Sequence, residues 1–220
     1  MSPRMLRLTL GVVTGLLATL VYFGARGTGP DATGDPADYD PFLAEPLPAP
    51  PLDLTDSEGA PVTLERLRGR VAALFFGYTQ CPDVCPITLA QLSRIQEELD
   101  PEGERLQIVF VSLDPVRDTA EVLERFTQSF HPGVIAATGE VESLRAQVLE
   151  YGIGFVYRPR AGGAADSVAP SPGGRLGDDY LVDHTARTFL IDEQGMLVAQ
   201  VLPETSSDVL KRAIERVIDG

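Results

Sequence analysis

The sequence has few residues that bind transition metals and few basic residues. Two cysteines and two histidines occur among 220 residues, so any metal site has a short list of candidate ligands. Two cysteines also cannot form the framework of several disulfides that stabilises many small secreted domains. Eighteen Lys and Arg against 32 Asp and Glu give a formal net charge of −14. Nucleic acid is therefore not an expected partner, because phosphate binding needs clustered Lys and Arg.

The first 24 residues are predicted to form a transmembrane anchor. Arg4 and Arg7 precede an uncharged run of 17 residues, Leu8 to Gly24, which is near the lower limit for crossing a bilayer. Basic residues before such a run place the N-terminus in the cytoplasm and the rest of the chain outside it. A cleaved signal segment is the alternative, and the lack of a nearby cysteine excludes a lipoprotein anchor. We expect attachment to a bacterial inner membrane, with the domain facing the periplasm.

Two further regions follow the anchor. Residues 25–51 are rich in Gly, Pro, Asp and Ala, show no apolar periodicity and are predicted to be a flexible linker. Residues 52–220 are predicted to form one domain, because about 170 residues suit a single hydrophobic core.

The apolar pattern of this domain predicts an α/β fold. Continuous apolar runs at 71–77 and 106–113 are typical of strands buried on both faces. The other predicted elements are hairpins within 52–64 and 187–202, a helix after the first buried strand, helices at 118–130, 140–151 and after 206, and a short strand at 134–137. This order predicts a mixed sheet flanked by helices, in a thioredoxin-like arrangement with an N-terminal hairpin. Residues 152–179 contain no predicted element and are either a functional loop or disordered.

Cys81 and Cys85 lie in a Cys-Pro-Asp-Val-Cys motif between a buried strand and a helix start. Sites form at the carboxyl ends of strands in open α/β sheets, and the positive end of a helix dipole lowers the pKa of a thiol. A short structural disulfide, a thiol–disulfide enzyme and a soft-metal site are the three interpretations. The small loop would add little stability, and thiol–disulfide enzymes usually have two residues between their cysteines. Structural zinc needs four ligands and iron–sulfur clusters need four cysteines, so copper, as Cu(I) or Cu(II), is the better match.

The two histidines differ in their sequence context. His184 lies just before a predicted strand whose start faces the cysteine loop in a thioredoxin-like sheet, and imidazole is a good copper ligand. Asp183 is the carboxylate expected to orient it. His131 follows a helix and precedes Pro-Gly, where the helix dipole and a turn explain it structurally. His184 is therefore predicted to be a metal ligand, and His131 is not.

Three motifs together resemble the Sco/SenC family. They are Phe-Gly-Tyr-Thr-Gln-Cys-Pro-Asp-Val-Cys-Pro at 76–86, Val-Ser-Leu-Asp-Pro-Val-Arg-Asp at 111–118 and Val-Asp-His-Thr at 182–185. The resemblance runs from about Leu52 to the C-terminus and implies a thioredoxin-like fold. It also implies a copper site made of Cys81, Cys85 and His184. For Asp114 and Asp118, it implies a structural or partner-contact role rather than ligation.

The resemblance implies a copper metallochaperone, not an enzyme. Such proteins deliver copper to the dinuclear copper site of cytochrome c oxidase subunit II, so that subunit or another copper-accepting protein is the expected partner. The alternatives are a thiol–disulfide reductase that keeps the recipient's cysteines reduced, with Cys81 and Cys85 as its redox-active pair, or a copper or redox sensor. Residues 182–187 contain no proline where thioredoxin-type reductases place their cis-proline, which favours metal binding over disulfide exchange.

Overall fold

The computed structural model describes residues 39–162, 164–165 and 179–220. The predicted anchor, residues 1–24, and the first part of the predicted linker lie outside these residues. All the elements described below belong to one compact unit, Pro41–Gly220. None of the helices among the described residues combines the length and the apolar character that crossing a bilayer requires.

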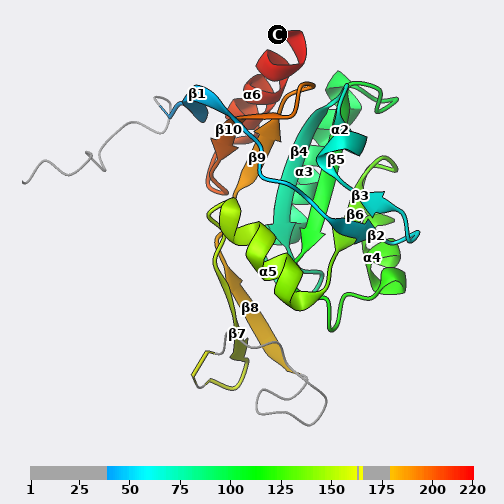
Figure 1. The fold of residues 1–220 in the computed structure, drawn as a ribbon, viewed down its shortest axis with the longest axis vertical. Helices are drawn as coiled ribbons and strands as arrows, with labels where there is room; N and C mark the ends of the chain where they lie inside the picture. The colour runs from blue at the N-terminus through cyan, green and yellow to red at the C-terminus, as the bar shows by residue number, and fades with distance from the viewer. Residues whose placement is uncertain (1–38, 163, 166–178) are drawn as a thin grey trace, which may run out of the picture. The chain divides into compact units, whose positions relative to one another are not determined.

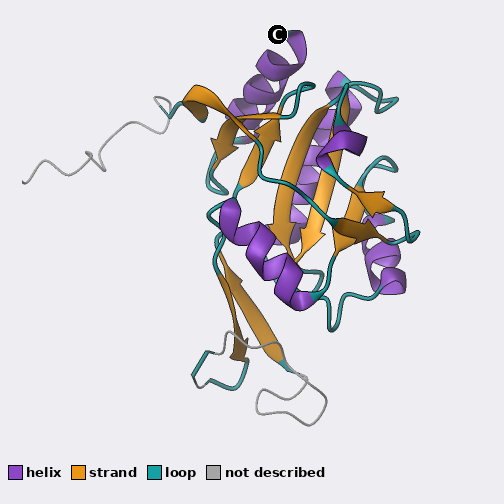
Figure 2. Ribbon diagram, viewed as in Figure 1, coloured by secondary structure: helices purple, strands orange, loops and turns teal. Residues whose placement is uncertain are grey.

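A mixed sheet of eight strands forms the centre of this unit (Figures 1 and 2). Its strands lie in the order β1-β10-β9-β4-β5-β6-β2-β3. The strands β4, β5 and β6 are parallel, and all other neighbouring pairs are antiparallel. Their bounds are β1 Phe42–Pro48, β2 Leu54–Asp56, β3 Pro61–Val62, β4 Val71–Gly77, β5 Leu106–Ser112, β6 Ile135–Thr138, β9 Thr188–Ile191 and β10 Met196–Val201.

Helices cover both faces of the sheet. They are α2 Leu64–Leu67, α3 Val84–Leu99, α4 Ala120–Thr127, α5 Val141–Glu150 and α6 Ser207–Asp219. The helices α3 and α6 contact each other on one face, and α5 lies over the opposite face (Figure 1). The predicted α/β class, with a mixed sheet flanked by helices and a β2–β3 hairpin near the N-terminal end, is confirmed.

The two central strands explain why the core forms here. Every residue of β4 and β5 is buried, and successive side chains point to opposite faces of a sheet. Phe75 stacks on Phe110 at 6.3 Å between ring centroids, whereas its neighbour Phe76 contacts Tyr151 and Phe189 at 5.3 and 5.7 Å. Both faces of the sheet are therefore filled with aromatic side chains, as the continuous apolar runs predict.

The chain enters the sheet earlier than the sequence predicts. Strand β1, Phe42–Pro48, falls within the predicted linker, and it pairs antiparallel with β10 at the edge of the sheet. Most of its side chains are exposed, so it joins the sheet through backbone pairing rather than through an apolar face. That is why the pattern of side chains does not reveal it.

The expectation of no regular structure across 152–179 is wrong in part. Strand β7, Phe155–Pro159, pairs antiparallel with β8, Tyr180–His184, and together they form a separate two-stranded ribbon. His184 is thus the last residue of the unpredicted strand β8, and it also precedes the predicted strand, β9, which begins at Thr188. Within the expected loop, residues 163 and 166–178 lie outside the described residues. The alternation of Phe155 and Tyr157, both buried, was the available signal for β7.

Candidate metal centre

The two cysteines occupy the connection between β4 and α3. The amide of Cys81 donates to the carbonyl of Tyr78 at 3.2 Å, which closes a turn directly after the strand. Cys85 is the second residue of α3 and is fully buried, whereas Cys81 is partly exposed. Gly77 makes room for the buried sulfur, because a Cβ there would lie 2.7 Å from Cys85 Sγ. Both cysteines are free thiols in the structure.

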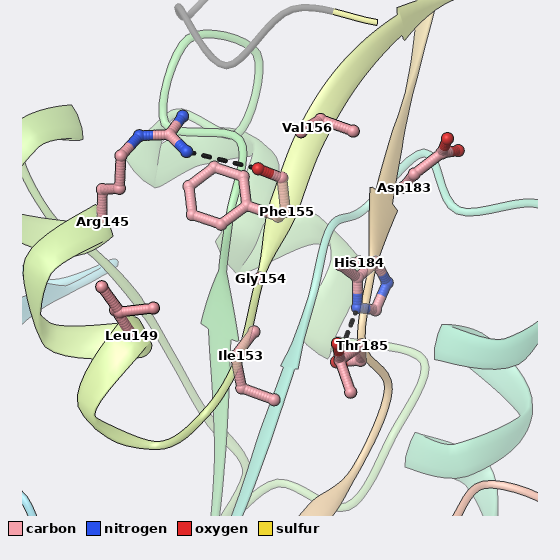
Figure 3. Close-up of a pocket in the computed structure, with 9 residues that line it drawn as sticks. All are labelled: Arg145, Leu149, Ile153, Gly154, Phe155, Val156, Asp183, His184 and Thr185. Carbon is pink, nitrogen blue, oxygen red and sulfur yellow. Dashed lines mark hydrogen bonds between the residues drawn. The ribbon is translucent and has the colours of Figure 1, made fainter.

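His184 reaches the same place from the end of β8. Its Nε2 lies 3.8 Å from Cys85 Sγ, and its ring meets the ring of Tyr78 edge-on, with centroids 6.0 Å apart. Its Nδ1 lies 3.3 Å from the carbonyl oxygen of Thr185 (Figure 3). Because a carbonyl can only accept, Nδ1 is the donor in this contact, and Nε2 is the ring nitrogen that faces the cysteines.

The expectation that Asp183 orients His184 is wrong. Its carboxylate accepts hydrogen bonds from Arg158 on the neighbouring strand β7. Successive side chains of a strand point to opposite faces, so a residue directly before His184 faces away from the cysteine pair. The carbonyl of Thr185 takes the orienting role instead.

The ligand atoms of Cys81, Cys85 and His184 lie within 4.8 Å of one another. The structure therefore brings together all three residues that the sequence singles out as metal ligands. His131 lies elsewhere, as expected. Its Nδ1 accepts from the amide of Gly133 at 3.0 Å and its Nε2 donates to the carbonyl of Pro101 at 3.2 Å, so both ring nitrogens have structural partners.

The two thiols differ in acidity. A hydrogen bond from the Cys85 thiol is the largest cause that lowers the pKa of Cys81, to about 4, and His184 and the backbone amides of Asp83 and Cys85 lower it further, against burial. The pKa of Cys85 is raised, first by that same hydrogen bond and then by burial and the charge on Cys81. Burial also raises the pKa of Tyr78 to about 12, so its phenol is neutral beside the cluster. The pair thus presents one accessible thiolate and one buried thiol.

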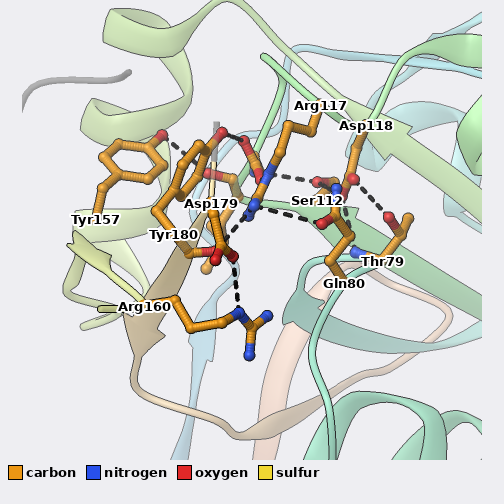
Figure 4. A network of polar contacts seen from close by, with 11 residues as sticks. Thr79, Gln80, Ser112, Arg117, Asp118, Tyr157, Arg160, Asp179 and Tyr180 are labelled. Carbon is orange, nitrogen blue, oxygen red and sulfur yellow. Dashed lines mark hydrogen bonds and ion pairs between the residues drawn. The ribbon is translucent and has the colours of Figure 1, made fainter. Parts of the chain in front are cut away.

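Asp118 supports the cysteine loop through hydrogen bonds to Thr79 (Figure 4). This buried carboxylate accepts from the amide and hydroxyl of Thr79, at 2.9 and 2.6 Å, and from the hydroxyl of Ser112. Burial raises the pKa of Asp118, and these hydrogen bonds oppose the rise. Thr79 lies two residues before Cys81, so Asp118 holds the chain where it leaves β4.

Asp114 supports β8 in the same way. It is fully buried and accepts from the hydroxyl of Tyr180 at 2.6 Å and from Nε of Arg117. The expected structural role of Asp114 and Asp118 agrees with these contacts. Tyr78, Arg117 and Tyr180 are support residues that the sequence does not single out. The alternation of Tyr180, Val182 and His184 on one face of a strand was the signal that could have revealed Tyr180.

A cavity of about 600 Å³ opens beside His184 (Figure 3). It lies between the end of α5 and the beginning of the ribbon, and one of its walls is the exposed side chain of Leu149. Its lining is mostly apolar and consists of Arg145, Leu149, Ile153, Gly154, Phe155, Val156, Asp183, His184 and Thr185. One of the three clustered ligands therefore borders open space.

A thioredoxin-like α/β fold with a cysteine pair after its central strand describes the class of protein. Within that class, the model of the SCO1/SenC family matches residues 45–219, and the chain belongs to this family.

Known members show how far the similarity extends. The chain is 37% identical over 149 residues to mitochondrial protein SCO2 of Saccharomyces cerevisiae, and that segment covers 67% of this chain but 45% of the yeast protein. The solution structure of apo Sco1 from Thermus thermophilus is similar with a TM-score of 0.65 and 36% identity, over 80% of this chain and 94% of that one. Bradyrhizobium japonicum ScoI, solved with copper bound, is similar with a TM-score of 0.62 and 28% identity, over 76% of this chain and 97% of that one. Copper is thus the metal held by a homologous structure.

Proposed function

We propose that this protein is a copper metallochaperone that holds copper between Cys81, Cys85 and His184 and delivers it to the dinuclear copper site of cytochrome c oxidase subunit II. The observation that carries the proposal is the approach of three ligand atoms to within 4.8 Å. Two thiolates and an imidazole suit copper, because soft sulfur ligands select Cu(I) and imidazole also binds Cu(II). The copper-bound relative supports the choice of metal.

The acidity of the two thiols suits capture of a metal ion. Cys81 is a thiolate at neutral pH, since its pKa is lowered to about 4. The proton on Cys85 is released when metal binds, so binding strengthens as pH rises. Nε2 of His184 already lies beside the sulfur of Cys85.

To release copper to a recipient, the site must be accessible to the recipient's ligands. A three-ligand site leaves a coordination position open, and a recipient's thiolates can take the ion through it by ligand exchange. His184 borders the cavity described above, and Cys81 is partly exposed. The recipient can therefore approach from the side where these two residues lie, while Cys85 stays buried.

The proposal includes a location. We propose that residues 1–24 anchor the chain in a bacterial inner membrane, that residues 25–51 contain the linker and that the domain faces the periplasm. The support is the basic, then apolar N-terminal sequence. The relative from Saccharomyces cerevisiae, protein SCO2, is a mitochondrial protein.

Copper titration of the reduced protein tests the site. We expect one copper per chain in the parent, and a loss of affinity of more than about tenfold in Cys81→Ser, Cys85→Ser and His184→Ala, since even residues behind the ligands typically contribute 10- to 100-fold. His131→Gln is the matched control, because it removes the other imidazole of the chain and should leave affinity unchanged. Near-parent affinity in His184→Ala would remove His184 from the site.

A thiol–disulfide reductase is the second candidate. One observation favours it, namely the contrast between a partly exposed, acidic Cys81 and a buried, less acidic Cys85, which suits a nucleophile and its resolving partner. Assays of the metal-free protein on a disulfide substrate separate the two functions. Turnover that survives His184→Ala supports the reductase, whereas copper transfer to apo subunit II that requires His184 supports the metallochaperone.

A further inference from the structure

His184 belongs to the two-stranded ribbon, whereas the cysteine pair lies in the connection between β4 of the main sheet and α3. Strand β8 pairs with β7 in the ribbon, whereas the cysteines follow β4 in the main sheet. No backbone ladder joins β8 to β4 among the described strands. The backbone reaches the main sheet again only at β9, which follows His184 after residues 185–187 and pairs with β4. Side chains that connect the ribbon to the cysteine loop therefore add to this link in setting the distance between the imidazole and the sulfur atoms.

Arg117 makes this connection (Figure 4). Its Nη1 donates to the backbone carbonyl of Tyr180 at 2.8 Å and lies 3.4 Å from Oε1 of Gln80, directly before Cys81. Its Nε donates to Asp114, which is fully buried and also accepts from the hydroxyl of Tyr180. One guanidinium thus contacts the cysteine loop, the start of β8 and the turn after β5.

The aromatic contacts of Arg117 extend to His184. The guanidinium lies 3.5 Å from the centroid of the Tyr180 ring and 6.0 Å from that of Tyr78. The ring of Tyr78 in turn meets the ring of His184 edge-on. Tyr180 and His184 lie on the same face of β8, since they are four residues apart and the period of a strand is two. If Tyr180 is held in place, β8 cannot slip along its axis, and His184 keeps its position opposite the cysteines.

This combination of hydrogen bonds and ring contacts requires arginine rather than any other cationic side chain. A planar guanidinium donates within its plane while a ring stacks on its face, and the round ammonium of lysine cannot do both in one position. Nη2 of Arg117 is buried and has no hydrogen-bond partner in the part of the chain that the structure describes. The position of the guanidinium therefore does not maximise its hydrogen bonds. It is the position that allows contact with the two tyrosine rings and with the Tyr180 carbonyl.

We infer that Arg117 is a positioning residue for the copper site, which sets the distance between His184 and the cysteine pair. The inference rests on the proposed function, because it concerns the same three ligands. The contacts of Arg117 described here are with neighbours of the three ligands, so Arg117 acts on the ligands through Tyr180, Tyr78 and Gln80.

The test compares Arg117→Lys with Arg125→Lys, an exposed arginine of α4. Copper(I) affinity is measured by competition with a chelator, and copper K-edge X-ray absorption counts sulfur and nitrogen ligands. We expect Arg117→Lys to lose the nitrogen ligand and about 10- to 100-fold in affinity, as residues behind metal ligands typically do. Arg125→Lys should match the parent in both. An unchanged absorption spectrum in Arg117→Lys would overturn the inference.

A double variant separates positioning from a general loss of stability. If Arg117 acts through His184, Arg117→Lys should have no further effect once His184 is replaced. The double variant should then bind copper within about twofold of His184→Ala alone, since twofold is about the error with which separate effects combine. Affinity losses that multiply contradict the inference. Urea unfolding of the metal-free variants shows whether each is folded, and Arg117→Lys keeps a positive charge opposite buried Asp114.

The inference also has a test that does not need copper. In the metal-free parent, the Tyr78 and His184 rings lie close enough for a nuclear Overhauser contact. That contact should weaken in Arg117→Lys and persist in Arg125→Lys, and its persistence in Arg117→Lys counts against the inference. If the parent fails to bind copper, the proposed function falls while this measurement still decides the role of Arg117.

Discussion

Gly77 is the last residue of β4, and it lies against the sulfur of Cys85. A Cβ at this position would lie 2.7 Å from Cys85 Sγ, 2.9 Å from Cε2 of Phe110 and 3.3 Å from Cε1 of Phe75. Non-bonded atoms are most stable at about 3.5–4.0 Å, so the sulfur would have to move by about 0.8 Å. Phe75 and Phe110 are fully buried and stacked on each other, which leaves their rings little space to retreat.

The substitution Gly77→Ala should therefore destabilise the fold and disturb the site together. Overfilling a packed core costs about 1–3 kcal/mol, and the loss of chain freedom in the unfolded state offsets about 0.4–1 kcal/mol. We expect a net loss of about 1–2 kcal/mol in urea unfolding of the reduced protein, and weaker copper binding because Cys85 is displaced.

Gly154→Ala is the matched control for stability. A Cβ at Gly154 meets no atom within 4 Å, and its φ does not lie in the left-handed region. Its free energy of unfolding should equal that of the parent within about 0.5 kcal/mol. The packing argument is refuted if Gly77→Ala unfolds at the same urea concentration as Gly154→Ala.

Three further predictions concern the two thiols and the buried tyrosines Tyr157 and Tyr180. Cys81 should react with iodoacetamide at about pH 6 far faster than Cys85, because the pKa of Cys81 is lowered to about 4 and that of buried Cys85 is raised; equal labelling in digests analysed by mass spectrometry would contradict this. Since that pKa lies below the usual 9.0, the folded state binds fewer protons than the unfolded one, and stability from Cys81 is lost as pH falls. The free energy of unfolding should thus rise from about pH 5 to 8 by more in the parent than in Cys81→Ser. Tyr180→Phe should cost about 1–3 kcal/mol, because it leaves Oδ1 of the buried Asp114 carboxylate without its donor while Oδ2 keeps Arg117. Tyr157→Phe, which loses a hydrogen bond to the neutral carbonyl of Leu113, should cost about 0.5–1.5 kcal/mol in the same urea assay, and the reverse order would show that the charge of Asp114 is unimportant.

The central part of the fold could be predicted from the sequence because side-chain burial dictates it. The continuous apolar runs of β4 and β5 match the predicted strands closely. Ser206 and Ser207 are both possible caps of the final helix from the sequence, and the structure shows Ser206 as the cap, its side chain accepting from the amide of Val209. The edge strand β1 and the ribbon strand β7 depend instead on backbone pairing to distant segments. Such pairing leaves little periodicity in a short strand, and Gly- and Pro-rich neighbours conceal it further.

The candidate site could be predicted only as far as residue chemistry reaches. Cys81, Cys85 and His184 are rare residue types in this chain, so their role as ligands is a natural hypothesis from the sequence. The partner of Asp183 could not be predicted, since it depends on the pairing of β7 with β8. The role of Arg117 could not be predicted either, because its contacts join segments that are 37 and 63 residues away in the chain.

The ribbon also divides the ligands between parts of the protein that differ in their resistance to unfolding. Local opening in a folded protein occurs in cooperative units, and units with few buried contacts open far more often than the core. Cys85 follows β4, a strand buried on both faces, whereas His184 belongs to a two-stranded ribbon that buries only one of its faces. Two-stranded ribbons are only marginally stable on their own. The imidazole can therefore dissociate during a partial opening that leaves both sulfur atoms in place. Hydrogen exchange should show this difference as low protection of the amides of β7 and β8 beside full protection of β4 and β5.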